Sequence, residues 1–245
     1  MTVLAADCFP TELPGNEVHV WIADPDQCDL TQLEDRHYRL LSAHERDKFR
    51  SFHFDKDRRQ YLAAHALTRL VLSRYTRLAP EEIDFASGPN GKPCARLPAP
   101  HTTIRHNLSH TAGLVGCVLA RGRACGIDIE SCRPLPALES IVPTVCSPDE
   151  IAQLEALGAH ARLHHFLRLW TLKEAYAKAT SEGLGAALAQ VSFRIEDEAV
   201  ACLIKGHAAA NWWFHSTLPT ERHVLALAVS GASGPLSVSL HRLHL

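Results

Sequence analysis

The sequence has no hydrophobic run long enough to cross a membrane, and its formal net charge is only −2 with histidine neutral. A transmembrane helix needs about 20 consecutive apolar residues, so we expect no membrane span. A nearly neutral chain gives no general electrostatic case for binding nucleic acid or an anionic membrane. Any phosphate chemistry must therefore depend on local groups of charged residues. The N-terminus also lacks the basic segment of a signal peptide, which predicts a cytoplasmic protein.

Several common signatures are missing as well. The eight cysteines form no CxxC pair, so a zinc knuckle has no support, and we expect reduced thiols rather than a disulfide scaffold. Walker A and Rossmann fingerprints are absent. No G-x-S-x-G motif surrounds Ser109, so a serine hydrolase is only weakly supported.

The composition is that of an ordinary globular protein, with 46% hydrophobic and 21% charged residues in 245. This length allows one large or two small domains. Asp55 is the expected N-cap of a long helix to about Tyr75, Ser147 caps a second helix, and a third covers 161–180. Period-two and apolar patterns predict strands at 18–22, 104–109, 114–119, 126–130, 191–195, 199–205, 212–216, 224–229 and 236–240. This mixed order, without a sequence repeat, favours an α+β fold.

A predicted strand and a predicted helix carry three carboxylates. The period of two places Asp128 and Glu130 on one face of the strand at 126–130. Helical geometry places Glu174 and Lys178 one turn apart on the helix at 161–180. Carboxylate oxygens are the ligands that Mg²⁺ prefers. The alternative, which the spacing leaves open, is a solvated edge strand and a surface Glu–Lys pair.

Basic and small polar residues form three further segments. Lys48 lies between Arg46 and Arg50, Lys92 lies in the Gly-Pro turn at 87–93, and small polar residues accompany histidine at 107–110. Fixed cations and hydroxyl or amide groups of this kind bind phosphate. The alternative is a solvated charged surface, because aspartates interleave with the basic residues around Lys48.

The order of these segments resembles a known family. Gly91-Lys92-Pro93 is followed by Asn107-Leu108-Ser109-His110, by Gly126-Ile127-Asp128-Ile129-Glu130, and by Trp170-x-x-Lys173-Glu174-Ala175-x-x-Lys178. Together they resemble the 4′-phosphopantetheinyl transferases, specifically the large type that activates peptide synthetases such as surfactin synthetase. The resemblance covers roughly residues 40–190 and rests on the combination of motifs, since each motif alone is weak.

The resemblance implies a reaction and its partners. The family transfers the phosphopantetheine arm of coenzyme A to a serine of an acyl or peptidyl carrier protein and releases adenosine 3′,5′-bisphosphate. It implies Mg²⁺ as cofactor, coenzyme A as co-substrate, a monomer, and no nucleic-acid or membrane partner. The alternatives are another metal-dependent enzyme acting on a nucleotide diphosphate, and a non-catalytic protein that binds coenzyme A or a carrier.

The resemblance also implies residue roles. Asp128, Glu130 and Glu174 would hold the metal, with Glu130 either a direct or a water-mediated ligand. Glu174 would also be the general base, directly or through water, and Lys178 would stabilise the leaving diphosphate. The implied coenzyme A contacts are Lys48, Asn90, Gly91, Lys92, Pro93, Asn107, Ser109, His110, Asp128 and Lys178.

The family fold implies two similar α/β halves related by a pseudo-twofold axis, with the active site in the cleft between them. The corresponding halves here are 1–124, with the basic segment and the Gly-Lys-Pro turn, and 125–245, with the carboxylates and the Trp-x-x-Lys-Glu-Ala helix. Two positions depart from the family pattern. Ser181 replaces a frequent glycine, and Glu45 and Arg46 stand near Lys48 where some members have another basic residue.

Overall fold

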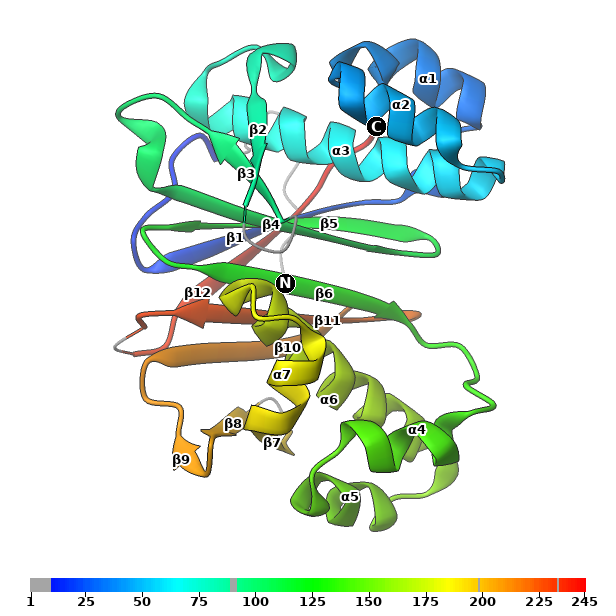
Figure 1. Cartoon of the computed structure of the whole chain (residues 1–245), viewed down its shortest axis with the longest axis vertical. Helices are drawn as coiled ribbons and strands as arrows, with labels where there is room; N and C mark the ends of the chain where they lie inside the picture. The colour runs from blue at the N-terminus through cyan, green and yellow to red at the C-terminus, as the bar shows by residue number, and fades with distance from the viewer. Residues whose placement is uncertain (1–9, 89–91, 198, 233) are drawn as a thin grey trace. The chain divides into compact units, whose positions relative to one another are not determined.

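The computed structural model describes residues 10–88, 92–197, 199–232 and 234–245, and has a mixed α+β architecture (Figure 1). The predicted fold class is therefore confirmed. The chain divides into two compact units, unit 1 with residues 1–123 and 236–245, and unit 2 with residues 124–235. The predicted pseudo-twofold axis and cleft concern how the units are placed relative to each other, and both remain predictions.

Unit 1 is built on a four-stranded sheet in the order β12-β1-β5-β4. Its strands are β1 (Glu17–Ala23), β4 (Ile104–Thr111), β5 (Leu114–Arg121) and β12 (Ser237–Arg242). The C-terminal strand β12 pairs in parallel with β1, from Glu17 opposite Ser237 to Ile22 opposite Arg242. Because of this pairing, the last ten residues belong to unit 1. The predicted division into residues 1–124 and 125–245 had placed them in the second half.

Unit 1 also contains helices, of which α3 (Asp55–Thr76) packs on this sheet, and a short hairpin. The helical elements are η2 (Pro25–Gln27), α1 (Leu30–His37), η3 (Tyr38–Leu40), α2 (Ala43–Ser51), α3 (Asp55–Thr76), η4 (Pro80–Glu82) and η6 (His101–Thr103). The hairpin joins β2 (Asp84–Ser87) to β3 (Pro93–Arg96), and Gly88 N–H donates to Lys92 C=O at 2.7 Å. The predicted turn thus has a strand on either side, while its residues 89–91 lie outside the described part.

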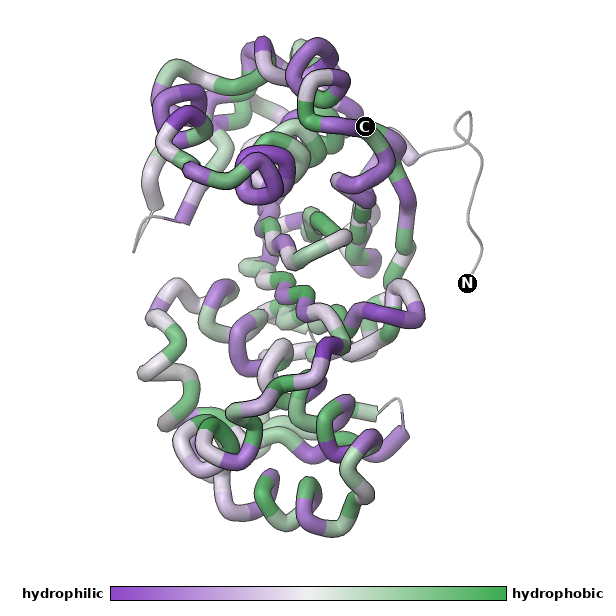
Figure 2. The backbone as a smooth tube through the Cα atoms, turned by 90° about the vertical axis from the view of Figure 1, so that its right-hand side faces the viewer, coloured by the Kyte–Doolittle hydropathy of each residue, from purple (hydrophilic) through white to green (hydrophobic). Residues whose placement is uncertain are grey.

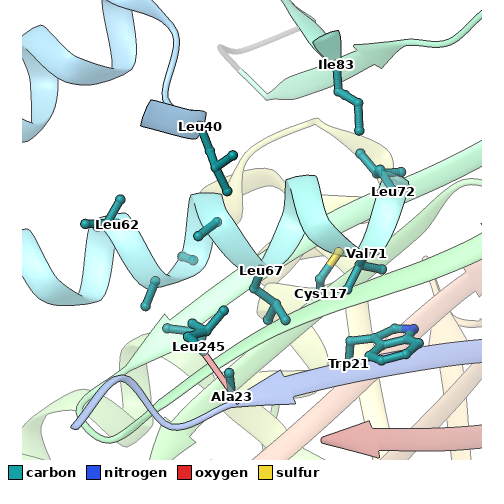
Figure 3. Packing of buried hydrophobic residues seen from close by; sticks show 14 of the residues in the cluster. Trp21, Ala23, Leu40, Leu62, Leu67, Val71, Leu72, Ile83, Cys117 and Leu245 are labelled. Atoms are coloured by element: carbon teal, nitrogen blue, oxygen red, sulfur yellow. The ribbon is translucent and has the colours of Figure 1, made fainter. Parts of the chain in front are cut away.

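The core of unit 1 lies between α3 and the sheet. Leu67 and Val71 of α3 point towards the strands that carry Trp21 and Cys117, and all four are buried (Figure 3). The C-terminal residue Leu245 is part of the same cluster. Burial of this apolar surface is the main force that holds α3 on the sheet.

Unit 2 contains a three-stranded antiparallel sheet in the order β10-β11-β6 and a smaller sheet in the order β7-β8-β9. Its strands are β6 (Cys125–Ser131), β7 (Val191–Glu196), β8 (Ala199–Ile204), β9 (His207–Ala208), β10 (Trp212–Thr220) and β11 (His223–Ser230). Its helices are α4 (Leu138–Val145), α5 (Pro148–Glu155), α6 (Ala159–Thr180) and α7 (Leu184–Gln190). The predicted strand-rich tail is therefore present.

The long helices α3 and α6 each contain 22 residues and each end at a residue in the left-handed conformation. These residues are Arg77, with φ 60°, and Ser181, with φ 59°. Hydrophilic and hydrophobic residues alternate along the helical parts of the chain (Figure 2), and α6 is buried on several sides because it packs on β6, β11 and neighbouring helices. Despite their length, none of the described helices is apolar enough to cross a bilayer.

The helix predicted from Asp55 begins there, although Phe54 rather than Asp55 is its N-cap.

The charged segment after residue 41 forms helix α2, which the sequence reasoning had not assigned. Ser42 and Glu45 form a complete capping box, in which each side chain accepts a hydrogen bond from the other residue's backbone N–H. Glu45 also accepts hydrogen bonds from His65 at 2.8 Å and from Arg69 at 2.6 Å. Burial alone would raise the pKa of the Glu45 carboxyl, but the hydrogen bonds from His65 and the Ser42 N–H, and the charges of His65 and Arg69, lower it to about 2.

The low pKa of Glu45 predicts a pH-dependent contribution to stability. The charged form is favoured in the folded state, so its contribution is present above about pH 4.5 and is lost as the pH falls towards 2. A shift of this size corresponds to about 3 kcal/mol. We expect Glu45→Gln to lower the free energy of unfolding by about that amount at pH 7, as measured by urea denaturation, and by much less near pH 2.5. An equal loss at both pH values would contradict this.

Candidate functional site

Strand β6 and helix α6 place the predicted carboxylates in one neighbourhood of unit 2. Asp128 lies opposite Ala226 of β11, and only 5% of its surface is exposed. It shares a strand face with Gly126 and Glu130, and Gly126 lies directly against α6. Although β6 is the edge strand of the described sheet, Asp128 is buried, so the alternative of a solvated strand face is excluded for this residue.

Gly126 permits an unusually close approach of α6 to β6. A Cβ atom at this position would clash with the backbone oxygen of Ala175 and would lie 2.8 Å from the nitrogen of Ala179. Both contacts involve backbone atoms, which have little freedom to move. The glycine thus allows Glu174 and Lys178, on the same helix, to come within reach of the β6 carboxylates.

The Lys178 ammonium donates to Asp128 Oδ1 at 2.7 Å, which is a short, charge-assisted contact. The Asp128 side chain is 8% exposed and that of Lys178 is 30% exposed. The lysine therefore forms its ion pair with the strand, while its charge also lowers the pKa of Glu174 on the same helix. This ion pair is the best-defined contact of the site.

The other two carboxylates are destabilised in their charged forms. Burial raises the pKa of Glu174, and so do the charges of Asp128 and Glu130, while Lys178 opposes them. Burial and the charge of Asp128 likewise raise the pKa of Glu130, against hydrogen bonds from Trp170 and the Ser131 backbone and the charge of Lys178. The carboxylates therefore repel one another, and a bound cation would relieve this repulsion.

The donor set suits a hard divalent cation, because it consists of carboxylate oxygens near one lysine. Within the described ranges, however, no three Asp, Glu, His or Cys side chains are arranged as a ready-made metal site. The carboxylates share a neighbourhood without converging on one point, and Lys178 occupies one oxygen of Asp128. The predicted metal ligands therefore remain a prediction.

Lys173, the lysine of the Trp-x-x-Lys-Glu-Ala motif, lies away from the carboxylates. It is fully buried and donates to Val191 C=O at 2.8 Å, and it forms a 3.0 Å ion pair with the equally buried Glu150. Sequence reasoning had not given this residue a role. Glu150 is the glutamate of the capping box that begins at Ser147, and the Oε2 atom that accepts from Ser147 N–H also faces the Lys173 ammonium.

In unit 1 the predicted coenzyme A residues lie on separate elements. Lys48 is exposed in the last turn of α2, and its Nζ lies 5.3 Å from the centroid of the Phe52 ring. Within the described part of the chain it forms no ion pair. Pro93 opens β3, and Asn90 and Gly91 lie outside the described residues.

The segment Asn107–His110, predicted to bind phosphate, lies on β4, where successive side chains point to opposite faces of the strand. Asn107 and Ser109 share one face and are buried, while His110 is exposed on the other. His106 shares the face of His110, and it was missed by the sequence reasoning. Burial lowers the pKa of His106 to about 4, with further contributions from the charges of Lys92 and Arg105. The charge of Lys92 is therefore felt at His106, one residue before the predicted phosphate segment.

The close approach at Gly126 gives a test of the site geometry. We expect Gly126→Ala to reduce stability by about 1–3 kcal/mol in urea denaturation, because the added methyl group forces α6 away from β6. Gly185→Ala in α7 is the matched control, since its Cβ would meet no atom within 4 Å. That control should be neutral or slightly stabilising. Equal stability of Gly126→Ala and the wild type would show that the helix is not held by this contact.

Comparison with known proteins assigns both units to one family. The model described as the 4′-phosphopantetheinyl transferase superfamily matches residues 124–228, and the model for the 4′-phosphopantetheinyl transferase N-terminal region matches residues 26–121. The motifs recognised in the sequence all lie within these two ranges. The matches therefore extend the resemblance to nearly the whole chain.

Individual relatives agree with the family models. The chain is 32% identical to the 4′-phosphopantetheinyl transferase HetI of Nostoc sp. over 89% of its own length and 90% of the relative. It is 32% identical to the Sfp transferase of Bacillus subtilis over 72% of this chain and 81% of that protein. A phosphopantetheinyl transferase of Thraustochytrium sp. is also 32% identical, over 77% of this chain and 70% of the relative. The chain belongs to the 4′-phosphopantetheinyl transferase superfamily.

Proposed function

We propose that this protein transfers the 4′-phosphopantetheine arm of coenzyme A to a serine of an apo acyl or peptidyl carrier protein. The observation that carries the proposal is the Lys178–Asp128 contact of 2.7 Å beside two carboxylates with raised pKa values. It joins the strand motif to the helix motif of the family. The products are the holo carrier protein and adenosine 3′,5′-bisphosphate.

Asp128 and Glu174 are the proposed ligands of Mg²⁺, with Glu130 as a third, direct or water-mediated ligand. When bound, the metal would neutralise charge on the diphosphate of coenzyme A. Lys178 would then leave Asp128 and donate its hydrogen bonds to the diphosphate, where negative charge grows as the leaving group departs. Its 30% exposure is consistent with a side chain that has room to reorient.

Glu174 is the proposed general base for the carrier serine. Its raised pKa suits this task, because a carboxylate is a stronger base when its charged form is less stable. The serine oxygen forms a bond to the phosphorus of the pantetheine-bearing phosphate, and the bond from that phosphorus to the bridging oxygen breaks. The serine proton passes to Glu174, directly or through water, and the electron pair leaves with adenosine 3′,5′-bisphosphate.

Unit 1 supplies the proposed contacts to the adenosine part of coenzyme A. Lys48 and His110 would contact the 3′-phosphate, and Lys92 and its turn would lie on the adenine side. The exposure of Lys48 and His110 keeps both side chains accessible to a ligand. The seven cysteines of the described part are free thiols, which supports our proposal of a reducing, cytoplasmic location.

Replacing the proposed ligand and base should abolish transfer. We expect Asp128→Asn and Glu174→Gln each to reduce conversion of apo to holo carrier by about 10²- to 10⁴-fold. The measurement is the mass increase of a panel of apo carriers incubated with coenzyme A and Mg²⁺. Glu139→Gln is the matched control, because Glu139 is an exposed glutamate of unit 2 paired with Arg162. Wild-type turnover by Asp128→Asn would contradict the proposal.

Removal of divalent metal gives an independent test. We expect EDTA to stop transfer by the wild-type protein and excess Mg²⁺ to restore it, because the carboxylates otherwise repel the diphosphate. Release of phosphopantetheine to water, with no modified carrier, would indicate a hydrolase acting on a nucleotide diphosphate instead. Binding of coenzyme A without any turnover would indicate a non-catalytic binding protein.

A further inference from the structure

Each unit contains a buried ion pair, and the two pairs have equivalent structural settings. In unit 2, Glu150 is the capping-box glutamate of α5 and pairs with Lys173 of α6 at 3.0 Å. In unit 1, Glu45 is the capping-box glutamate of α2 and pairs with Arg69 of α3 at 2.6 Å. Each pair joins the start of a short helix to the middle of a long one.

The correspondence extends to helix position. Arg69 and Lys173 are each the fifteenth residue of a 22-residue helix. Each also donates to a backbone carbonyl beyond its own helix, Arg69 to Ile83 and Lys173 to Val191. The sequence shows no repeat, so this equivalence is visible only in the structure.

Both pairs are well shielded from water. Side-chain exposure is 0% for Lys173 and Glu150, and 2% and 10% for Arg69 and Glu45. Glu150 also accepts a hydrogen bond from Phe193 N–H at 2.8 Å, so its carboxylate connects α5, α6 and β7. A buried pair of this kind is a poor source of stability but a strict geometric constraint, because neither charge can be left alone.

Each pair lies next to a residue of the proposed reaction, but a different one. Lys173 directly precedes Glu174 on α6, the proposed metal ligand and base. Glu45 lies three residues before Lys48 on α2, the proposed contact of the 3′-phosphate. Fixing the register of α6 fixes where Glu174 meets the face of β6, and fixing α2 fixes where Lys48 is presented.

We propose that the two ion pairs are positioning devices with separate duties. The Glu150–Lys173 pair positions the metal-binding carboxylate, and the Glu45–Arg69 pair positions the cation for the 3′-phosphate. Lys173 is thus a positioning residue of the motif and does not touch coenzyme A. The inference rests on the proposed function for the identity of the two ligands.

Double variants test the proposal while avoiding an unpaired buried charge. Glu150→Gln with Lys173→Met, and Glu45→Gln with Arg69→Met, replace each charged pair by uncharged, unbranched side chains, and glutamine still serves the capping box. Two affinities are measured for each variant of the full-length chain. These are the Kd of Mn²⁺ alone, by electron paramagnetic resonance, and the Kd of adenosine 3′,5′-bisphosphate in EDTA, by calorimetry.

We expect a crossed result, in which each double variant loses one of the two affinities and keeps the other. The unit 2 variant should weaken Mn²⁺ binding by about ten- to a hundredfold, as is usual when the support of a metal ligand is lost, and leave nucleotide affinity within about twofold of wild type. The unit 1 variant should weaken the nucleotide and leave Mn²⁺ binding unchanged. Lys173→Arg, which keeps the charge, should largely restore Mn²⁺ affinity.

Other outcomes overturn the inference. Equal losses of both affinities in both variants, or intact affinities in folded variants with lower melting temperatures, would show that the pairs are only structural. If a double variant does not fold, Lys173→Arg and Arg69→Lys, which keep the charge but change the geometry of each pair, should show the same crossed pattern with smaller losses. Failure of the wild-type protein to modify any carrier would contradict the proposed function, whereas the two binding measurements would still decide the positioning roles.

Discussion

The site depends on one steric constraint, the direct contact of α6 with β6 at Gly126. A side chain at this position would clash with the backbone of α6. Without that contact, Glu174 and Lys178 could not lie near Asp128, because they reach it from the same helix. The ion pair between Lys178 and Asp128 and the raised pKa values of Glu174 and Glu130 are consequences of this packing. A glycine without catalytic chemistry thus determines where the chemistry is placed.

Charge is distributed differently in the structural and the functional parts of the protein. The Glu150–Lys173 and Glu45–Arg69 pairs are buried, satisfied by several hydrogen bonds, and joined to backbone groups. Among the described residues, Lys178 is the cation that acts on the carboxylates of Glu130 and Glu174, and its charge does not offset burial and the charge of Asp128, so their pKa values remain raised. Such incomplete compensation is costly in a fold and is typical of sites that bind a charged ligand. The two kinds of charge cluster therefore indicate different purposes, although both involve motif residues.

Much of this organisation could be predicted from sequence. The period-two pattern at 126–130 and the long helix ending near 180 are strong local signals, and both elements are present with the predicted residues. The capping-box pattern predicts the start of α5 at Ser147, and the same pattern at Ser42 and Glu45 marks the start of α2, which the sequence analysis does not predict. Three features needed the structure because they depend on contacts between distant segments. These are the pairing of β12 with β1, the burial of Lys173 against Glu150, and the separation of Asn107 from His110 on opposite faces of β4.

The central claim is that Asp128 and Glu174 hold the metal and that Lys178 turns from Asp128 to the diphosphate. The most direct measurement is a crystal structure with coenzyme A and Mn²⁺, in which anomalous scattering locates the metal. The account predicts one anomalous peak, at a metal ion bound by the carboxylates of Asp128 and Glu174. It also predicts that the Lys178 ammonium donates a hydrogen bond to a diphosphate oxygen. A peak elsewhere, with the 2.7 Å Lys178–Asp128 pair intact in the coenzyme A complex, would contradict it.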